Sequence, residues 1–259
     1  MKLNSHLLLP AIAVASLTIC SCNREKPYTI NGVLNIPAEI PYGDTLLQLP
    51  SPEGEWVYLM EDGEEPVDSC QIVDNRFTFS GVVSKDDAHF AQVGCMFFSA
   101  LVAIEPGDIT ISADVMQSTV SGTPSNDALN SMMFEMSAIE NTMQQVITAM
   151  QDSLDKAGVE MGFEQYEELQ NRYITMQGNA LDSIYEANKD NLASIYAAVL
   201  RNADNGSASE FEEAMNQYPK RVSENAFVKQ IIRSLKQQEE MMQGQSYDEN
   251  LFGDAETQE

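Results

Sequence analysis

The chain divides into two halves that differ in the period of their apolar residues. Between residues 28 and 120, short β-prone runs alternate with turns rich in proline, glycine and acidic residues, and residues 76–80 alternate apolar and polar side chains. Many short strands with closely spaced turns favour a β-sandwich. Asp74-Asn75 predicts a hairpin between two of these runs, and Pro106-Gly107-Asp108 predicts a turn between two others. We therefore expect an antiparallel β-sandwich in this half.

After residue 120 the apolar residues recur every three or four positions, which is the period of an amphipathic helix. The first stripe consists of Met132, Met136, Ile139, Met143, Val146 and Met150. Ser125 or Asn126 is expected to cap this helix, and Gly158 and Gly162 to end it. Four further stripes begin at Phe163, Leu192, Phe211 and Phe227. The short connections predict an antiparallel helical bundle, so the fold class is α+β. The methionines match the helical period, which favours core packing over an adaptable binding surface.

The first 22 residues have the pattern of a secretory signal. Lys2 supplies a positive charge, and residues 7–19 form an apolar run that is too short to cross a bilayer, which needs about 20 residues. The run ends in Ile19-Cys20-Ser21-Cys22. This sequence resembles a bacterial lipobox, with Cys22 as the lipid acceptor because the small Ser21 precedes it. We expect Cys22 to anchor the chain to a membrane through its acyl chains.

These patterns predict five parts: a signal peptide (1–21), a lipidated tether (22–27), the β-sandwich (28–122), the helical bundle (123–243) and a tail (244–259). The tail is acidic and rich in turn residues, so we expect it to be disordered. The tether has no Asp directly after Cys22 and no acidic run. Its pattern resembles that of lipoproteins on the periplasmic face of the outer membrane, which is the location we expect.

The negative charge of the chain disfavours two classes of partner, nucleic acids and anionic lipid surfaces. Lys and Arg total 14 against 40 Asp and Glu, a formal net charge of −26. Phosphate backbones attract Lys and Arg, so nucleic acid is excluded as an expected partner. Electrostatic docking on anionic lipid is disfavoured for the same reason.

Side chains suited to catalysis are scarce. Cys70 and Cys95 are the only thiols after Cys22, and both lie in strand-like sequence. Three interpretations remain open for this pair: two buried structural cysteines, a structural disulfide, or a redox-active pair. His89 is the only histidine outside the signal, whereas a zinc site needs several ligands and a Ser-His-Asp triad needs a placed base. We expect no catalytic residue, no metal and no cofactor.

Four short motifs in the strand half occur in an order that resembles one known family. Residues 28–32 resemble its opening strand, and residues 68–81 (DSCQIVDNRFTFSG) resemble its pattern DS…V.DG.F.F.G. Residues 104–109 (IEPGDI) resemble its LEPGDI segment, and residues 120–126 (VSGTPSN) resemble its V.GT..N segment. Residues 28–126 are thus similar to domain of unknown function 4369, the N-terminal module of Bacteroidetes-type thiol-disulfide oxidoreductase lipoproteins.

In such lipoproteins a thioredoxin-like domain with a Trp-Cys-x-x-Cys site follows. Here the only tryptophan is Trp56 and no cysteine follows Cys95, so the resemblance does not carry redox activity to this chain. We therefore expect a lipid-anchored envelope protein that acts as a non-catalytic binding or interaction module. The alternative, which rests on the family analogy, is an accessory module that recruits or orients a thioredoxin-like oxidoreductase in trans. A third interpretation is a remnant of a truncated oxidoreductase.

Overall fold

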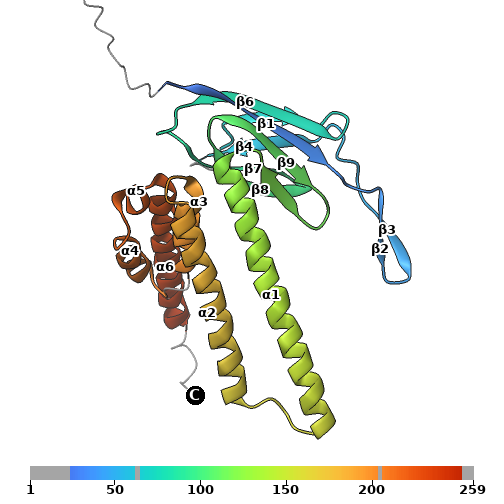
Figure 1. Ribbon diagram of the computed structural model, residues 1–259, viewed down its shortest axis with the longest axis vertical. Helices are drawn as coiled ribbons and strands as arrows, with labels where there is room; N and C mark the ends of the chain where they lie inside the picture. The colour runs from blue at the N-terminus through green and yellow to red at the C-terminus, as the bar shows by residue number, and fades with distance from the viewer. Residues whose placement is uncertain (1–23, 62–64, 204–205, 253–259) are drawn as a thin grey trace, which may run out of the picture.

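The structure is a computed structural model that describes residues 24–61, 65–203 and 206–252, the last ten by their backbone alone (Figure 1). In these residues ten strands precede six helices, so the α+β class is confirmed. The strands are β1 (Lys26–Leu34), β2 (Glu39–Tyr42), β3 (Thr45–Gln48), β4 (Trp56–Met60), β5 (Asp68–Gln71), β6 (Arg76–Val83), β7 (His89–Cys95), β8 (Phe98–Ile104), β9 (Gly107–Ala113) and β10 (Ser118–Ser121). Cys22 and the predicted signal peptide lie outside the described residues.

Two four-stranded sheets form the N-terminal half, with strand orders β10-β9-β1-β6 and β5-β4-β7-β8. Alternate residues of each sheet are buried in a shared core that includes Ile30, Val57, Phe79, Val93 and Ile109. Strand β5 also contacts β6, and β10 contacts β8, so the two sheets meet at both sides. The two apolar faces therefore cover each other, as the alternating pattern predicts.

Strands β1 and β9 pair in parallel, whereas the other strand pairs of the two sheets are antiparallel. The predicted antiparallel sandwich is corrected for this one pair. Hairpins join neighbouring strands and make them antiparallel. β1 and β9, however, are separated in sequence by all four strands of the second sheet. No local sequence signal therefore indicates that they pair.

Both turns that the sequence predicts are present. Asp74 and Asn75 have φ values of 52° and 58°, the left-handed backbone of a two-residue hairpin turn. Val73 and Arg76 exchange two backbone hydrogen bonds across this turn. Gly107 begins β9 with φ of 133°, a conformation that glycine adopts without strain.

Strands β2 and β3 form a separate ribbon that projects from the sandwich (Figure 1). Apart from the half-buried Ile40, its residues are exposed, including the apolar Tyr42, Leu46 and Leu47.

The helices are α1 (Pro124–Ala157), α2 (Phe163–Ala187), α3 (Leu192–Arg201), α4 (Ala208–Met215), α5 (Lys220–Ser223) and α6 (Ala226–Phe252). Thr123, and neither Ser125 nor Asn126, is the N-cap of α1, so the predicted cap is wrong. Pro124 has no N–H to donate and has the φ of a first helical residue, so it sets the start of the helix. Gly158 ends α1 with φ of 69°, as predicted.

The helices build a second core that reaches the sandwich. It includes Met132, Ile195 and Phe211 from the helices and Phe90 from strand β7. Helices α1 and α2 form a long hairpin that points away from the sandwich, while α3 to α6 gather beside its base (Figure 1). Helix α6 continues to Phe252 and so covers residues 244–252, which the sequence assigned to the tail.

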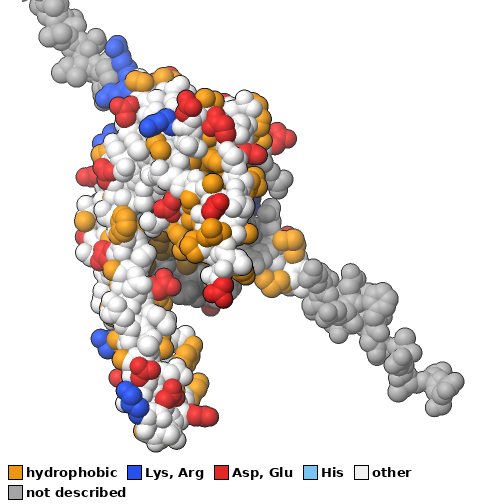
Figure 2. Space-filling model, turned by 90° about the vertical axis from the view of Figure 1, so that its right-hand side faces the viewer, with side chains coloured by type: hydrophobic (Ala, Val, Ile, Leu, Met, Phe, Trp, Pro, Cys, Tyr) orange, Lys and Arg blue, Asp and Glu red, His pale blue; other side chains and the backbone are white. Residues whose placement is uncertain are grey.

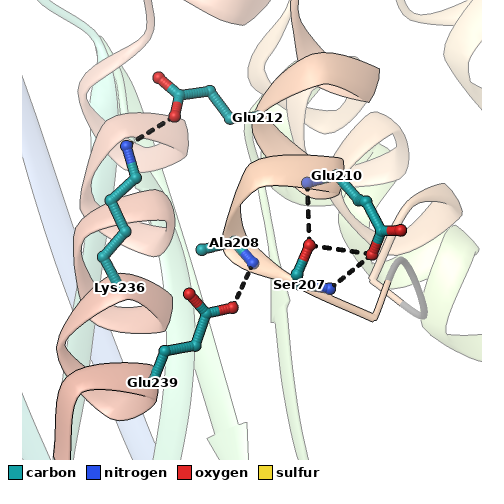
Figure 3. A network of polar contacts seen from close by, with 6 residues as sticks. All are labelled: Ser207, Ala208, Glu210, Glu212, Lys236 and Glu239. Carbon is teal, nitrogen blue, oxygen red and sulfur yellow. Dashed lines mark hydrogen bonds and ion pairs between the residues drawn. The ribbon is translucent and has the colours of Figure 1, made fainter. Parts of the chain in front are cut away.

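Polar contacts fix α4 against α6 (Figure 3). Ser207 and Glu210 form a capping box at the start of α4, with the Glu210 N–H donating to Ser207 Oγ at 3.2 Å. From α6, Glu239 accepts a hydrogen bond from the N–H of Ala208 at 2.7 Å, and Lys236 pairs with Glu212 at 2.6 Å. The N–H groups in the first turn of α4 therefore find acceptors both in the capping box and on α6.

None of the helices in the described residues combines the length and the apolar character needed to cross a membrane.

Candidate functional site

The motif segments of the strand half meet where the sandwich joins the helices. Asn126 is fully buried in the first turn of α1. Its side-chain oxygen accepts a hydrogen bond from the N–H of Ala103 at 2.9 Å, and its amide nitrogen donates to the carbonyl of Ala103 at 2.8 Å. The same nitrogen donates to Thr123 Oγ1 at 2.7 Å. Asn126 thus pairs with the backbone of β8 and fixes the start of α1 to the sandwich.

Glu105 extends this junction towards the other helices. Its carboxylate accepts hydrogen bonds from the N–H and the hydroxyl of Ser125, both at 2.7 Å. Ser125 Oγ in turn accepts from the N–H of Leu192, the first residue of α3, at 3.2 Å. Arg221 of α5 donates to the carbonyl of Asn191 and to Ser194 Oγ. A continuous set of hydrogen bonds therefore joins β8 to α1, α3 and α5.

The side chains of this junction have an architectural role. Ser125, Asn126 and Ser194 are fully buried, and each has hydrogen-bond partners within the chain. Glu105 and Arg221 also line a cleft of about 270 Å³ beside these side chains. Their polar groups already make hydrogen bonds within the junction. We therefore assign the family motifs at this point to folding, and look elsewhere for a binding site.

Cys70 and Cys95 are free thiols, half-buried against the sandwich core. Val57 of β4 pairs with Cys70 on one side. On the other side of β4, Tyr58 pairs with Gly94 of β7. Continuing this antiparallel register by one residue places Cys95 opposite Val57. Two strand spacings, roughly 10 Å, therefore separate the cysteines, whereas a disulfide needs Cα atoms within about 7 Å.

The free thiols and the register of their strands favour two structural cysteines over a disulfide between Cys70 and Cys95. Burial raises the pKa of the Cys70 thiol above its ordinary value, and the charge of Asp68 adds to the effect, against a hydrogen bond from the Thr78 backbone. A raised pKa lowers the fraction of thiolate, the reactive form, near neutral pH.

We predict that Cys70 and Cys95 both react with Ellman's reagent after unfolding without reductant. In the folded protein at pH 8, Cys70 should react about tenfold more slowly than in urea, because its raised pKa suppresses the thiolate. A Cys95→Ser variant isolates the Cys70 signal, and the rate should rise with pH. A chain that shows no free thiol after unfolding in the absence of reductant would contradict this arrangement.

His89 is the first residue of β7 and is half-buried. Its Nδ1 lies 2.8 Å from the carbonyl oxygen of Asp87, and its Nε2 lies 3.2 Å from Glu61 Oε1. In the described part of the chain, no group of three or more His, Cys, Asp or Glu side chains is placed to hold a metal ion.

A different feature stands out on the α1–α2 hairpin, where the two helices leave an apolar groove between them. It encloses about 410 Å³. Its walls come from both helices and from the loop that joins them: Glu140, Met143, Gln144, Ile147, Met161, Tyr166, Leu169, Gln170 and Tyr173. We call these nine residues the hairpin groove.

Exposed apolar residues continue the hairpin groove towards the tip of the hairpin. Val159 and Phe163 are exposed by 55% and 75%, and Tyr166 within the groove is exposed by 58%. Figure 2 shows this hairpin projecting below the body of the protein, with hydrophobic side chains among acidic ones. Exposed apolar side chains that gather beside a groove are typical of a binding surface.

The sequence did not reveal the hairpin groove, because its residues follow the same helical period as core residues. The signal that could have found it is length. The stripes from Met132 to Met150 and from Phe163 to Ala180 are much longer than the 10-residue α3 and the 8-residue α4. The 10-residue α3 is too short to cover the whole of α2, so part of the apolar stripe stays open to solvent. The 27-residue α6 is long enough, but its main contacts are with α4, α5 and β7.

Residues 28–129 match the family model described as "Domain of unknown function (DUF4369)". The resemblance drawn from the four motifs is thereby confirmed, and the chain contains this domain. The matched segment spans the sandwich and the first turns of α1, so it includes the junction at Asn126 and ends before the hairpin groove. No curated protein matches the chain.

Proposed function

We propose that this chain, with its DUF4369 domain at residues 28–129, is a lipid-anchored envelope protein that binds another protein and performs no catalysis of its own. The observation that carries the proposal is the apolar hairpin groove on a projecting pair of helices. A surface of this kind is stabilised by covering it, and a protein partner can do so.

The direction of the hairpin fits an anchored protein. The chain enters β1 at the top of Figure 1, and the tip of the α1–α2 hairpin lies at the opposite end. Helix α1 has 34 residues, a length of about 50 Å at 1.5 Å per residue. With acyl chains on Cys22, the hairpin would extend away from the membrane surface. We place the anchor in the outer membrane, facing the periplasm, from the lipobox and tether patterns.

The test is site-specific photo-crosslinking in living cells that express the full chain. A photoreactive amino acid replaces Ile147 or Tyr166 in the hairpin groove, and Val82 on β6, exposed by 60%, serves as the control position. We expect the two groove positions to capture the same protein and Val82 not to capture it. Groove positions that yield no adduct, or only those seen from Val82, would overturn the proposal.

The identity of the captured protein separates the two versions of this function. A thioredoxin-like lipoprotein would support the accessory role, in which the chain recruits or orients an oxidoreductase in trans. Any other envelope protein would remove the redox link and leave a general interaction module. A Cys22→Ser variant tests the anchor in the same cells, because loss of the acyl chains should release the protein from the membrane fraction.

A further inference from the structure

Among the residues that the structure describes, only α1, α2 and the loop between them line the hairpin groove, and no third helix does. The main contacts of α2 are with α1 and α3, and α3 has only 10 residues, so it covers the end of α2 next to it. Further along the hairpin, apolar side chains of both helices remain only half-buried: Met136, Val146, Ile147, Met150, Tyr173 and Met176. Two helices alone bury one side of each apolar stripe, and a third helix is the usual way to bury the rest.

The charge around the hairpin groove indicates which kind of helix would fit. Residues 136–177 contain seven acidic residues and two basic ones, Lys156 and Arg172. The acidic Glu140 lines the groove itself, and acidic side chains lie among the hydrophobic ones on the hairpin in Figure 2. A second copy of this chain, with a net charge of −26, would add like charge, whereas a cationic partner would be attracted.

The dimensions also suit a helix. Glu140, Met143, Gln144 and Ile147 line the groove from two successive turns of α1, and Tyr166, Leu169, Gln170 and Tyr173 line it from two turns of α2. Amphipathic helices insert side chains at positions i, i+3, i+4 and i+7 into grooves of this length. The methionines of the groove can adjust to such side chains.

We propose that the hairpin groove receives a basic amphipathic helix of another protein, which completes a three-helix bundle with α1 and α2. This inference rests on the proposed function, and it names the class of partner. The apolar face of the helix would cover Ile147, Tyr166 and Tyr173, and its Lys or Arg residues would lie near Glu140 and the other acidic residues of the hairpin.

The test uses the purified, lipidated full chain with the photoreactive residue at Ile147 or, as a control, at Val82. Three labelled peptides of 18 residues are compared. The first has Leu at helical spacing and Lys elsewhere, the second has the same composition in scrambled order, and the third has Glu in place of Lys. We expect the first peptide to give about tenfold more adduct at Ile147 than either of the others. At Val82 the three should differ little.

Two matched variants test whether the hairpin groove itself binds the peptide. Tyr166→Lys places a cation in the groove, and Ile174→Lys makes the same kind of change on α2 outside it. Their side chains are exposed by 58% and 47%, so neither change should prevent folding, which circular dichroism checks. In each variant a photoreactive residue at Gln144 reports the peptide adduct. Tyr166→Lys should lower the adduct about tenfold, and Ile174→Lys by less than about twofold.

The outcomes separate the partner class from the function. Equal adducts from the ordered and scrambled Lys peptides, or from the Lys and Glu peptides, would overturn the basic helix while leaving any protein captured in cells as support for the proposed function. Tight binding of the apolar dye N-phenyl-1-naphthylamine without a preference among the peptides would assign the groove to a small apolar ligand instead. A crosslinked pair of identical chains would assign it to a second copy.

Discussion

Replacing Asn126 with alanine should lower the free energy of unfolding by about 3 kcal/mol, because the change leaves buried polar groups without partners. The Asn126 amide makes hydrogen bonds to both backbone groups of Ala103 and to Thr123 Oγ1. Without it, the N–H and the carbonyl of Ala103, a residue with 0% exposure, would face an apolar cavity. Each such group costs about 1–3 kcal/mol when it is desolvated and unpaired.

Urea unfolding measures this loss, with Asn130→Ala as the control. Asn130 lies one turn further along α1 and is half-buried, so its replacement should change the free energy of unfolding by less than about 1 kcal/mol. Asn126→Asp keeps the shape of the side chain but places a buried carboxylate against the Ala103 carbonyl, and should be at least as destabilising as alanine. Equal stability of the Asn126→Ala and Asn130→Ala variants would contradict the role of the junction.

The same experiment reports whether the two halves unfold together. Trp56, the only tryptophan, lies on β4 of the sandwich, so its fluorescence follows that half. Far-ultraviolet circular dichroism follows mainly the helices. In the unmodified chain the two transitions should coincide, because Phe90 and Ala103 of the sandwich share the helical core. Weakening the junction at Asn126 should separate them.

The features that the sequence predicted well depend on neighbouring residues. The change of period near residue 120 marks the end of the strands at Ser121. Asp74 and Asn75 form the predicted turn because their short polar side chains tolerate positive φ. Gly158 ends α1 for a related reason. In each case the energetic preference lies within a few residues, so the pattern is visible in the sequence alone.

The features that it missed depend on residues far apart in the chain. Asn126 has the side chain of an N-cap, yet it binds Ala103 of β8, a partner that only the folded sandwich supplies. Cys70 lies in β5 and Cys95 in β7, and β4 lies between these two strands in the sheet and sets the separation of the cysteines. The hairpin groove exists because α3 is too short to cover α2. Such facts follow from topology, which period and spacing do not encode.

Replacing Gly122 with alanine should lower the free energy of unfolding by about 3 kcal/mol, from a strained φ and a backbone clash together. Gly122 has φ of 101°. A Cβ at this position would lie 2.3 Å from the carbonyl oxygen of Asp108, in the turn that starts β9. The backbone of Asp108 could retreat only by disturbing its pairing with Thr29 of β1. Loss of the 2.8 Å hydrogen bond from Gly122 N–H to Asp127 Oδ1 would add to the cost.

Gly158→Ala is the matched control, because it separates the two causes. Gly158 also has positive φ, at 69°, but a Cβ there would meet no atom within 4 Å. Its replacement should therefore cost only the strain of a left-handed alanine, about 1 kcal/mol. Urea unfolding of both variants gives the difference, about 2 kcal/mol by these estimates. A difference of that size would mean that the glycine of the Gly122-Thr123 motif is required by the close approach of β9. Equal losses would mean that positive φ alone requires it, and that β9 can move aside.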